Sequence, residues 1–285
     1  MNAVPDRVGV LGGGRMGAGI AHAFLLAGAE AAVVERDRMS ADAARARILR
    51  AVEASIERGT TTFPLETLAP RLHVGVDLDV FGHVALAVEA VPEDLAMKHE
   101  ALAAVEARLP SGAVLASNTS SLSIDDLAVV LERPERFLGL HFFNPVPASS
   151  LVEVVTGTAT DAGLVAQAQD WVRALGKTPV TVADAPGFAS SRLGVTLGLE
   201  AIRMLEEGVA SAEDIDAAMV LGYKHPMGPL RLTDLVGLDV RLGIAEYLAE
   251  RLGPRFEPPE LLRHLVAEGK LGRKTGQGFY DWNDA

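Results

Sequence analysis

Residues 8–17 of the chain are Val-Gly-Val-Leu-Gly-Gly-Gly-Arg-Met-Gly, and they carry the strongest indication of the fold class. Its first four residues form an apolar run with the length of a buried strand. The spacing G-x-G-x-x-G follows at Gly12, Gly14 and Gly17, and apolar residues at helical spacing come next. A second apolar run, residues 31–34, ends at Glu35. Together these features predict a strand, a tight turn, a helix and a second strand, the βαβ unit that binds dinucleotides.

The turn predicts a pyrophosphate site. Glycines let the backbone approach the phosphates, and the N-terminus of the following helix favours their charge. Arg15 and Met16, inside the motif, belong to the predicted cofactor site with Gly12, Gly14 and Gly17. The alternative is a glycine-rich turn in another doubly wound fold.

Glu35 predicts which cofactor binds. A carboxylate there accepts hydrogen bonds from the ribose hydroxyls and repels a 2′-phosphate, which favours NAD. Arg36 follows directly and would favour NADP if its side chain turned inward.

Composition sets the outer limits. The 285 residues are 49% hydrophobic, enough for a large core, and the net charge of −12 argues against nucleic acid without excluding an anionic ligand. The absence of cysteine excludes disulfides, thiolate catalysis and cysteine-ligated metal, and we predict no metal site. The N-terminus lacks the layout of a signal peptide and no apolar run reaches membrane-spanning length, so we expect a cytoplasmic protein without a membrane partner.

The chain divides near residue 184. Before it, strand-like runs alternate with helical segments, except in the less regular segment 60–79; the predicted further strands are residues 84–88, 113–117, 137–140, 151–155 and 178–183. After the break at Asp184-Ala185-Pro186-Gly187, we predict only helices, at residues 188–207, 212–221, 230–237, 240–252 and 259–268. The prediction is an α/β Rossmann-type doubly wound sheet, residues 1–184, that binds NAD, followed by a smaller all-α domain, residues 185–285.

His141 and Glu153 form the candidate catalytic pair. His141 ends an apolar run, Pro145 and Pro147 force a turn, and a second strand begins at Leu151. Glu153 shares a strand face with Leu151, where a carboxylate is costly unless it is paired. A carboxylate that orients an imidazole makes a general base. The alternative is a core histidine and an edge-strand glutamate without chemistry.

Polar residues also gather where the strand of residues 113–117 ends. Asn118-Thr119-Ser120-Ser121 follow it, and ligands bind outside the carboxyl ends of strands in such sheets. The cluster either contacts a ligand or caps the next helix, for which Ser123 is a good start. Glu93 and Lys98 would be ordinary surface charges in most proteins. The basic, glycine-rich residues 270–280 either attract phosphate or form a solvated tail, and the aromatic residues near the end disfavour the tail.

The chain resembles the bacterial short-chain 3-hydroxyacyl-CoA dehydrogenases of the 3-hydroxybutyryl-CoA dehydrogenase type. The resemblance covers nearly the whole length, in family order, through GGGRMGAGIA (12–21), VEAVPED (88–94), SNTSSLSI (117–124), GLHFFNP (139–145), LVEVV (151–155), PGF (186–188), HPMGPL (225–230) and GRKTGQGFYDW (272–282). It implies a Rossmann domain with a helical dimerisation domain, hence a homodimer. It also implies NAD-linked oxidation of the 3-hydroxyl group of an acyl-CoA thioester, as in fatty acid β-oxidation.

The resemblance assigns roles to single residues. The family's catalytic histidine falls on His141 and its orienting glutamate on Glu153. Its polar contacts to substrate and nicotinamide fall on Ser120 and Asn144, so that Ser120 would hold the substrate hydroxyl and Asn144 would support it. Its further cofactor contacts fall on Glu35, Glu93, Lys98 and Lys274.

Two positions depart from the family pattern. Ser191 replaces an asparagine that contacts substrate near the thioester, and serine is shorter, so a bridging water or a shifted substrate is needed. In the helical arm that touches CoA, Ala51 loses a hydroxyl while Arg58 keeps a positive charge for a phosphate. These departures leave open the acyl chain and whether CoA or acyl-carrier protein carries it.

Two other classes of protein remain. One is the β-hydroxyacid dehydrogenase type with a catalytic lysine, which the His–Glu pair and the GRKTGQGFYDW ending disfavour. The other is a non-catalytic NAD-binding relative, crystallin-like or redox-sensing. The presence of both His141 and Glu153 argues against it, because cofactor binding alone does not need the pair.

Overall fold

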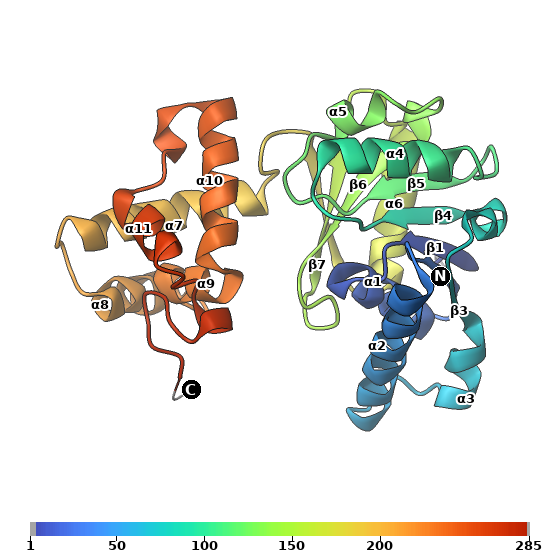
Figure 1. Ribbon diagram of the computed structural model, residues 1–285, viewed down its shortest axis with the longest axis horizontal. Coiled ribbons are helices and arrows are strands. Elements are labelled where there is room, and N and C mark those ends of the chain that lie inside the picture. Colours follow the sequence, from blue (N-terminus) through green and yellow to red (C-terminus); the bar gives the residue numbers. More distant parts are fainter. Residues whose placement is uncertain (1–3, 284–285) are drawn as a thin grey trace. The chain divides into compact units, whose positions relative to one another are not determined.

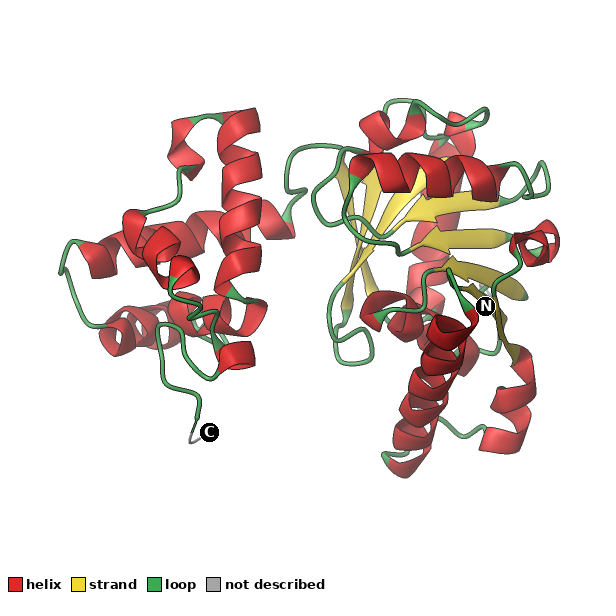
Figure 2. Ribbon diagram, viewed as in Figure 1, coloured by secondary structure: helices red, strands yellow, loops and turns green. Residues whose placement is uncertain are grey.

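The structure, a computed structural model, describes residues 4–283 (Figure 1). The chain forms two compact units, one ending at Ala185 and one beginning at Pro186. The first is an α/β unit built on one sheet, and the second is helical (Figure 2). The predicted fold class, a Rossmann-type sheet followed by an all-α domain, is confirmed.

The sheet has eight strands in the order β3-β2-β1-β4-β5-β6-β7-β8. The first six positions repeat the strand order of dinucleotide-binding sheets. In these sheets, strands are added on one side of β1 and then, from β4, on its other side. Strands β1 to β6 are parallel, β7 is antiparallel to β6, and β8 is parallel to β7. The strands are β1 (Arg7–Leu11), β2 (Glu30–Val34), β3 (Leu72–Gly75), β4 (Leu86–Glu89), β5 (Val114–Ser117), β6 (Phe137–Phe142), β7 (Leu151–Thr156) and β8 (Thr178–Ala183).

Strand β3 corrects the prediction of a less regular segment at residues 60–79. The strand has four residues, and only Leu72 is buried. It lies at the edge of the sheet, beside β2. Leu72 and Val74 alternate with His73 and Gly75, but four residues are too few for a clear strand pattern, and pairing with β2 makes the segment a strand.

Helices cover both faces of the sheet (Figure 2). Strands covered on both faces need apolar residues throughout, and every residue of β4, β5 and β6 is buried. Helices α1 and α6 share a core with β1 and β7, built on residues such as Ile20, Phe24 and Trp171. The helices of this unit are α1 (Arg15–Leu26), α2 (Arg38–Glu57), α3 (Leu65–Leu68), α4 (Leu95–Glu106), α5 (Ile124–Ala128) and α6 (Ala162–Ala174).

The second unit packs five α-helices around its own apolar core. They are α7 (Ser190–Glu206), α8 (Ala212–Ala217), α9 (Pro229–Val236), α10 (Leu238–Leu252) and α11 (Glu260–Ala267). A π-helical turn, Ala218–Gly222, extends α8, so the predicted helix at residues 212–221 changes type part-way.

The segment after α11 is held by one buried carboxylate. Asp234, in α9, accepts hydrogen bonds from the backbone N–H groups of Phe279 and Tyr280 and from the Trp282 indole. A Cβ at Gly278 would lie 2.2 Å from an Asp234 oxygen, so only glycine fits there. The sequence GRKTGQGFYDW therefore forms packed structure rather than a solvated tail.

Candidate active site

His141 and Glu153 lie opposite each other on paired strands. The antiparallel register of β6 and β7 places the two residues directly across from one another. The His141 Nδ1 atom is 2.8 Å from Glu153 Oε2, and both side chains are buried. The ring of Phe143 packs against the imidazole with centroids 4.3 Å apart. Since Nδ1 is engaged by the carboxylate, Nε2 is the ring nitrogen suited to exchange a proton with a substrate.

Glu93 organises the polar loop after β5. Its Oε1 atom accepts hydrogen bonds from both the backbone and the hydroxyl of Ser120, at 2.8 and 3.1 Å, and from Ser121 in the same way. The Thr119 hydroxyl donates to the same oxygen at 2.7 Å. Burial raises the pKa of this carboxyl, but Lys98 and these hydrogen bonds outweigh it and hold the pKa of Glu93 below its usual value. One carboxylate thus fixes the backbone that carries Ser120.

Lys98 is buried, unlike the surface lysines of most proteins. Its Nζ atom is 2.6 Å from Glu89 Oε1, 3.2 Å from the Val91 carbonyl oxygen and 3.3 Å from Glu93 Oε2. Glu89 also accepts the hydroxyl of Ser117 at 2.5 Å. The ammonium therefore uses its three donors within the protein, and its charge acts directly on Glu93.

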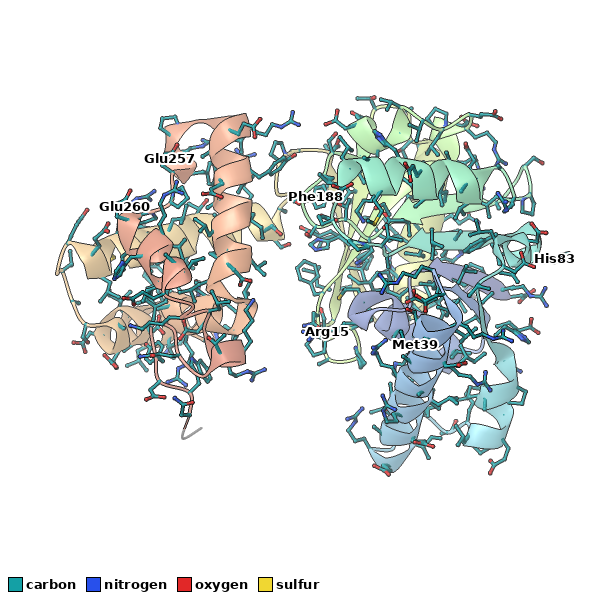
Figure 3. The ribbon with its side chains drawn as sticks, in the orientation of Figure 1. Arg15, Met39, His83, Phe188, Glu257 and Glu260 are labelled. Carbon is teal, nitrogen blue, oxygen red and sulfur yellow. The ribbon has the colours of Figure 1, made fainter. Side chains whose placement is uncertain are left out.

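The glycine turn joins β1 to α1, with Arg15 at the start of the helix (Figure 3). No side chain caps this helix. Gly12 has φ +91°, and a Cβ on it would lie 2.8 Å from the Ala90 carbonyl oxygen. A Cβ on Gly17 would lie only 1.8 Å from the Gly12 carbonyl oxygen, whereas one on Gly14 would meet nothing within 4 Å. Gly12 and Gly17 permit the turn, and Gly14 leaves its outer side open.

Glu35 lies beside this turn. Its Oε1 atom accepts the Gly13 N–H at 2.8 Å, and its Oε2 atom accepts the Arg36 N–H at 3.2 Å. The Arg36 side chain is exposed and pairs with Asp37 at 3.1 Å. The carboxylate, not the guanidinium, therefore faces the turn.

Asn144 is exposed in the turn between β6 and β7. Lys177 ties this turn down, donating to the Val146 and Ser149 carbonyl oxygens at 2.6 and 2.5 Å. On the preceding strand, the Phe142 N–H donates to the Asn118 side chain at 2.9 Å, which joins the Ser120 loop to β6.

Arg58 lines a cavity of about 670 Å³ beside α1, α2 and the Asn144 turn. Lys177 and His22 line it as well, and no acidic side chain does. The charged side chains in this lining, Arg58 and Lys177, are therefore basic, although the chain as a whole carries a charge of −12.

Ser191 and Lys274 belong to the helical unit. Ser191 is half-buried in the first turn of α7. The Lys274 ammonium pairs with both oxygens of Asp239, at 2.5 and 2.6 Å. Within residues 4–283, no cluster of three or more histidine or acidic residues could hold a metal ion, and no helix is long and apolar enough to cross a membrane.

Two family models together match almost the whole chain. The NAD-binding domain of 3-hydroxyacyl-CoA dehydrogenase matches residues 7–185, and the C-terminal domain of the same enzyme matches residues 187–282. The chain belongs to the 3-hydroxyacyl-CoA dehydrogenase family.

Individual relatives extend along the full length. A 3-hydroxybutyryl-CoA dehydrogenase of Mycobacterium tuberculosis is 43% identical over 286 residues, covering 99% of this chain and 100% of the relative. The human mitochondrial hydroxyacyl-coenzyme A dehydrogenase is 39% identical, covering 98% of this chain and 92% of the relative. The crystal structure of (S)-3-hydroxybutyryl-CoA dehydrogenase PaaH1 from Ralstonia eutropha is 36% identical, with a TM-score of 0.92 over 98% of this chain and 99% of that one.

These matches confirm the predicted family, the NAD cofactor and the assignment as a dehydrogenase. The residues present fit NAD, whose pyrophosphate needs a site with free backbone N–H groups. The uncapped start of α1 and the open side of Gly14 make one. Glu35 beside the turn suits a ribose.

Sequence reasoning missed two side chains of this site. Arg47, in α2, donates to the Gly13 carbonyl oxygen at 2.6 Å and so braces the cofactor turn. Glu89 holds Lys98 from the end of β4. Glu89 lies within the motif VEAVPED, but in the sequence it looks like any acidic residue at a strand end. Only the burial of its side chain distinguishes it.

Proposed function

We propose that this dehydrogenase interconverts short-chain 3-hydroxyacyl-CoA and 3-ketoacyl-CoA thioesters, with 3-hydroxybutyryl-CoA as the model substrate, and that His141 and Glu153 carry the proton transfer. The observation that carries this proposal is the 2.8 Å contact between His141 Nδ1 and Glu153 Oε2 on paired strands. Two of the relatives are named 3-hydroxybutyryl-CoA dehydrogenases, which supports the substrate class.

In the direction of oxidation, His141 Nε2 takes the proton of the 3-hydroxyl group. Glu153 holds the imidazole by its other nitrogen and stabilises the imidazolium that forms. Ser120 holds the substrate hydroxyl, on a backbone that Glu93 fixes, and Asn144 supports it from the turn after β6. NAD, when bound, supplies the acceptor for the hydride that leaves C3.

The cofactor contacts that we propose are those of the glycine turn, with Arg15 and Met16, and of Glu35, Glu93, Ser120, Asn144, Lys98 and Lys274. Both of these lysines would act partly through neighbours. Lys98 is engaged with Glu89 and Glu93, and Lys274 with Asp239, so each also positions a carboxylate.

For the thioester carrier, we propose CoA rather than acyl-carrier protein. Arg58 would hold a phosphate, and the cavity that it lines contains Lys177 and His22 without an acidic residue. Ser191 would contact the substrate near the thioester. Acetoacetyl-pantetheine, which lacks the CoA nucleotide, should therefore be a poorer substrate than acetoacetyl-CoA.

We further propose a homodimer formed through the helical unit, acting in the cytoplasm in fatty acid β-oxidation. Among the residues that the structure describes, half of the exposed large apolar side chains lie after residue 185, including Leu193, Leu221 and Tyr223. An apolar surface of this kind favours association. Light scattering after size exclusion gives the mass that tests it.

The central experiment is NADH oxidation with acetoacetyl-CoA, compared with acetoacetate and a longer 3-ketoacyl-CoA. His141→Ala should lower kcat by roughly 10²–10⁴-fold, since that is the usual contribution of a positioned proton donor or acceptor. Glu153→Gln should also lower kcat strongly, because the amide does not stabilise an imidazolium. NADH binding, measured by fluorescence, should persist in both. Near-normal turnover in either variant would contradict the mechanism.

A further inference from the structure

Arg47, in α2, is a cation held at the cofactor turn without an acidic partner. Its Nη1 atom donates to the Gly13 carbonyl oxygen at 2.6 Å. In the part of the chain that the structure describes, this is the one hydrogen bond of its side chain, and no carboxylate lies within ion-pair distance of it. The exposed Arg36, by contrast, is paired with Asp37. Since a guanidinium has several N–H donors, most of those of Arg47 remain available to a ligand.

The packing of α2 on the turn places Arg47 there. Gly13 is buried against α2, and a Cβ on it would lie 2.5 Å from the Ala44 Cβ atom. Arg47 follows Ala44 by three residues and so shares its face of the helix. Helix α2 also packs beside α1, whose first residue is Arg15. A buried contact therefore fixes the part of α2 that carries the Arg47 charge.

Glu35 and Arg47 bind opposite groups of the same residue. The Glu35 Oε1 atom accepts the Gly13 N–H at 2.8 Å, and Arg47 donates to the Gly13 carbonyl oxygen. A carboxylate suits ribose hydroxyls, and a guanidinium suits phosphate oxygens. In a dinucleotide the adenosine ribose is joined directly to the pyrophosphate. The two side chains thus match neighbouring parts of one molecule.

The charge of Arg47 also corrects the electrostatics of the turn. The Gly13 carbonyl oxygen carries a partial negative charge, which disfavours an anion beside it, and the guanidinium bound to this oxygen reverses the local sign. The N-terminus of α1 contributes only about half an elementary charge, whereas a pyrophosphate bears a charge on each phosphate. Arg47 adds a full positive charge at the same turn.

We propose that Arg47 binds the pyrophosphate of NAD directly, beyond bracing the glycine turn. The inference rests on the cofactor contacts proposed for that turn and does not depend on which acyl group the enzyme accepts.

The test measures binding rather than turnover. NADH is titrated by fluorescence, and ADP and adenosine are measured as its competitors. Arg47→Met should weaken NADH and ADP by roughly 10-fold, less than a buried charged hydrogen bond would give, because Arg47 is exposed. Adenosine, which has no phosphate, should bind as before. The affinity of the variant for NADH should also depend less on salt, and Arg47→Lys, which keeps a charge, should retain most of the affinity.

Arg45→Met is the matched control. Arg45 is also an exposed arginine of α2 that donates to a backbone carbonyl oxygen, that of Leu72 at 3.0 Å, but Leu72 belongs to the edge strand β3. This variant should bind NADH and ADP like wild type. Thermal unfolding without ligand compares the two variants, and Arg47→Gln, which keeps a polar side chain, replaces Arg47→Met if that variant does not fold.

The outcomes separate a phosphate contact from the other roles of Arg47. Equal weakening of ADP and adenosine would mean that Arg47 only braces the turn and would overturn the proposal. Unchanged affinity for NADH and ADP overturns it as well, and a raised KM for acetoacetyl-CoA in that case would assign the guanidinium to a phosphate of CoA. Gly14→Val, which fills the open side of the turn, tests the cofactor site itself. Normal NADH binding in that variant would overturn the proposed contacts of the turn as a whole.

Discussion

At the scale of single residues, the choice of cofactor depends on two neighbours with opposite charge. Glu35 faces the glycine turn through its bond to the Gly13 N–H, while the Arg36 side chain turns away and pairs with Asp37. The alternative of an inward Arg36, which would favour NADP, is not the conformation of this structure. The geometry therefore favours the unphosphorylated ribose.

We expect wild type to prefer NADH strongly over NADPH and Glu35→Gln to reduce that preference by roughly 10-fold or more, because about 1.4 kcal/mol of repulsion corresponds to one decade. Steady-state kinetics with both cofactors measures it. Arg36→Ala is the matched control and should keep the preference. Equal efficiency of the two cofactors in wild type would show that Arg36 governs the pocket.

Ser191 is the second position where we expect one side chain to change a kinetic constant, here the kcat/KM for the thioester substrate. If its hydroxyl or a bound water serves the substrate carbonyl, Ser191→Ala should lose about 0.5–1.5 kcal/mol, or roughly 2–12-fold in kcat/KM with acetoacetyl-CoA. Ser191→Asn, assayed beside it, restores the longer side chain of the family. A neutral Ser191→Ala with a faster Ser191→Asn would mean that the serine is a simple loss, and two neutral variants would remove Ser191 from the site.

At the scale of elements, the site depends on how strand ends are tied together. Glu93, just before α4, joins this helix to the loop after β5. Lys98 of α4 pairs with the Glu93 carboxylate and neutralises its charge. The Asn118 side chain then ties that loop to β6, the strand of His141. Ser120 and His141 are thus positioned by the same short series of hydrogen bonds.

This network predicts a pH dependence. The pKa of Glu93 is lower in the folded protein than its ordinary value of 4.5. A group with a depressed folded pKa contributes stability above its unfolded pKa and loses that contribution as the pH falls through its folded pKa. Glu93→Gln should therefore unfold at a lower temperature than wild type at pH 7, and the gap should shrink below pH 4.5. Thermal unfolding of both proteins across this range measures it, and a constant gap would contradict the assignment.

At the scale of the whole molecule, each unit has a core of its own, and the helical unit is closed by its C-terminal segment. Asp234 is 1% exposed and accepts three N–H groups from residues 279–282. Tyr280 reaches Asp216 in α8 through its hydroxyl at 2.8 Å. Residues 279–282 therefore join α8 and α9.

Asp234→Ala should destabilise the helical unit by about 3–5 kcal/mol, because it leaves several buried donors unsatisfied. Asp281→Ala is the control, since Asp281 accepts only exposed bonds from Asn283. Urea denaturation followed by tryptophan fluorescence reports it, as Trp282 lies at the site. Equal stability of the two variants would remove the closing role of Asp234.

Sequence alone predicts the fold class and the cofactor motif, and it makes His141 and Glu153 a candidate pair. These depend on local information: glycine spacing, runs of apolar residues, and a short turn that brings two strands together. The resemblance to a family then assigned roles to residues such as Ser120 and Lys274, which no local pattern could do.

Which charged side chains are buried, and which groups they contact, follows only from the packing of the folded chain. Lys98 and Arg241 look alike in the sequence, yet Lys98 is surrounded by Glu89 and Glu93, whereas the buried Nε atom of Arg241 has no hydrogen-bond partner among the described residues. The strand β3 and the contact of Arg47 with Gly13 likewise depend on segments that lie far apart in the chain. For side chains from segments far apart in the chain, the partner depends on which strands and helices pack side by side, and that arrangement carries no local signature in the sequence.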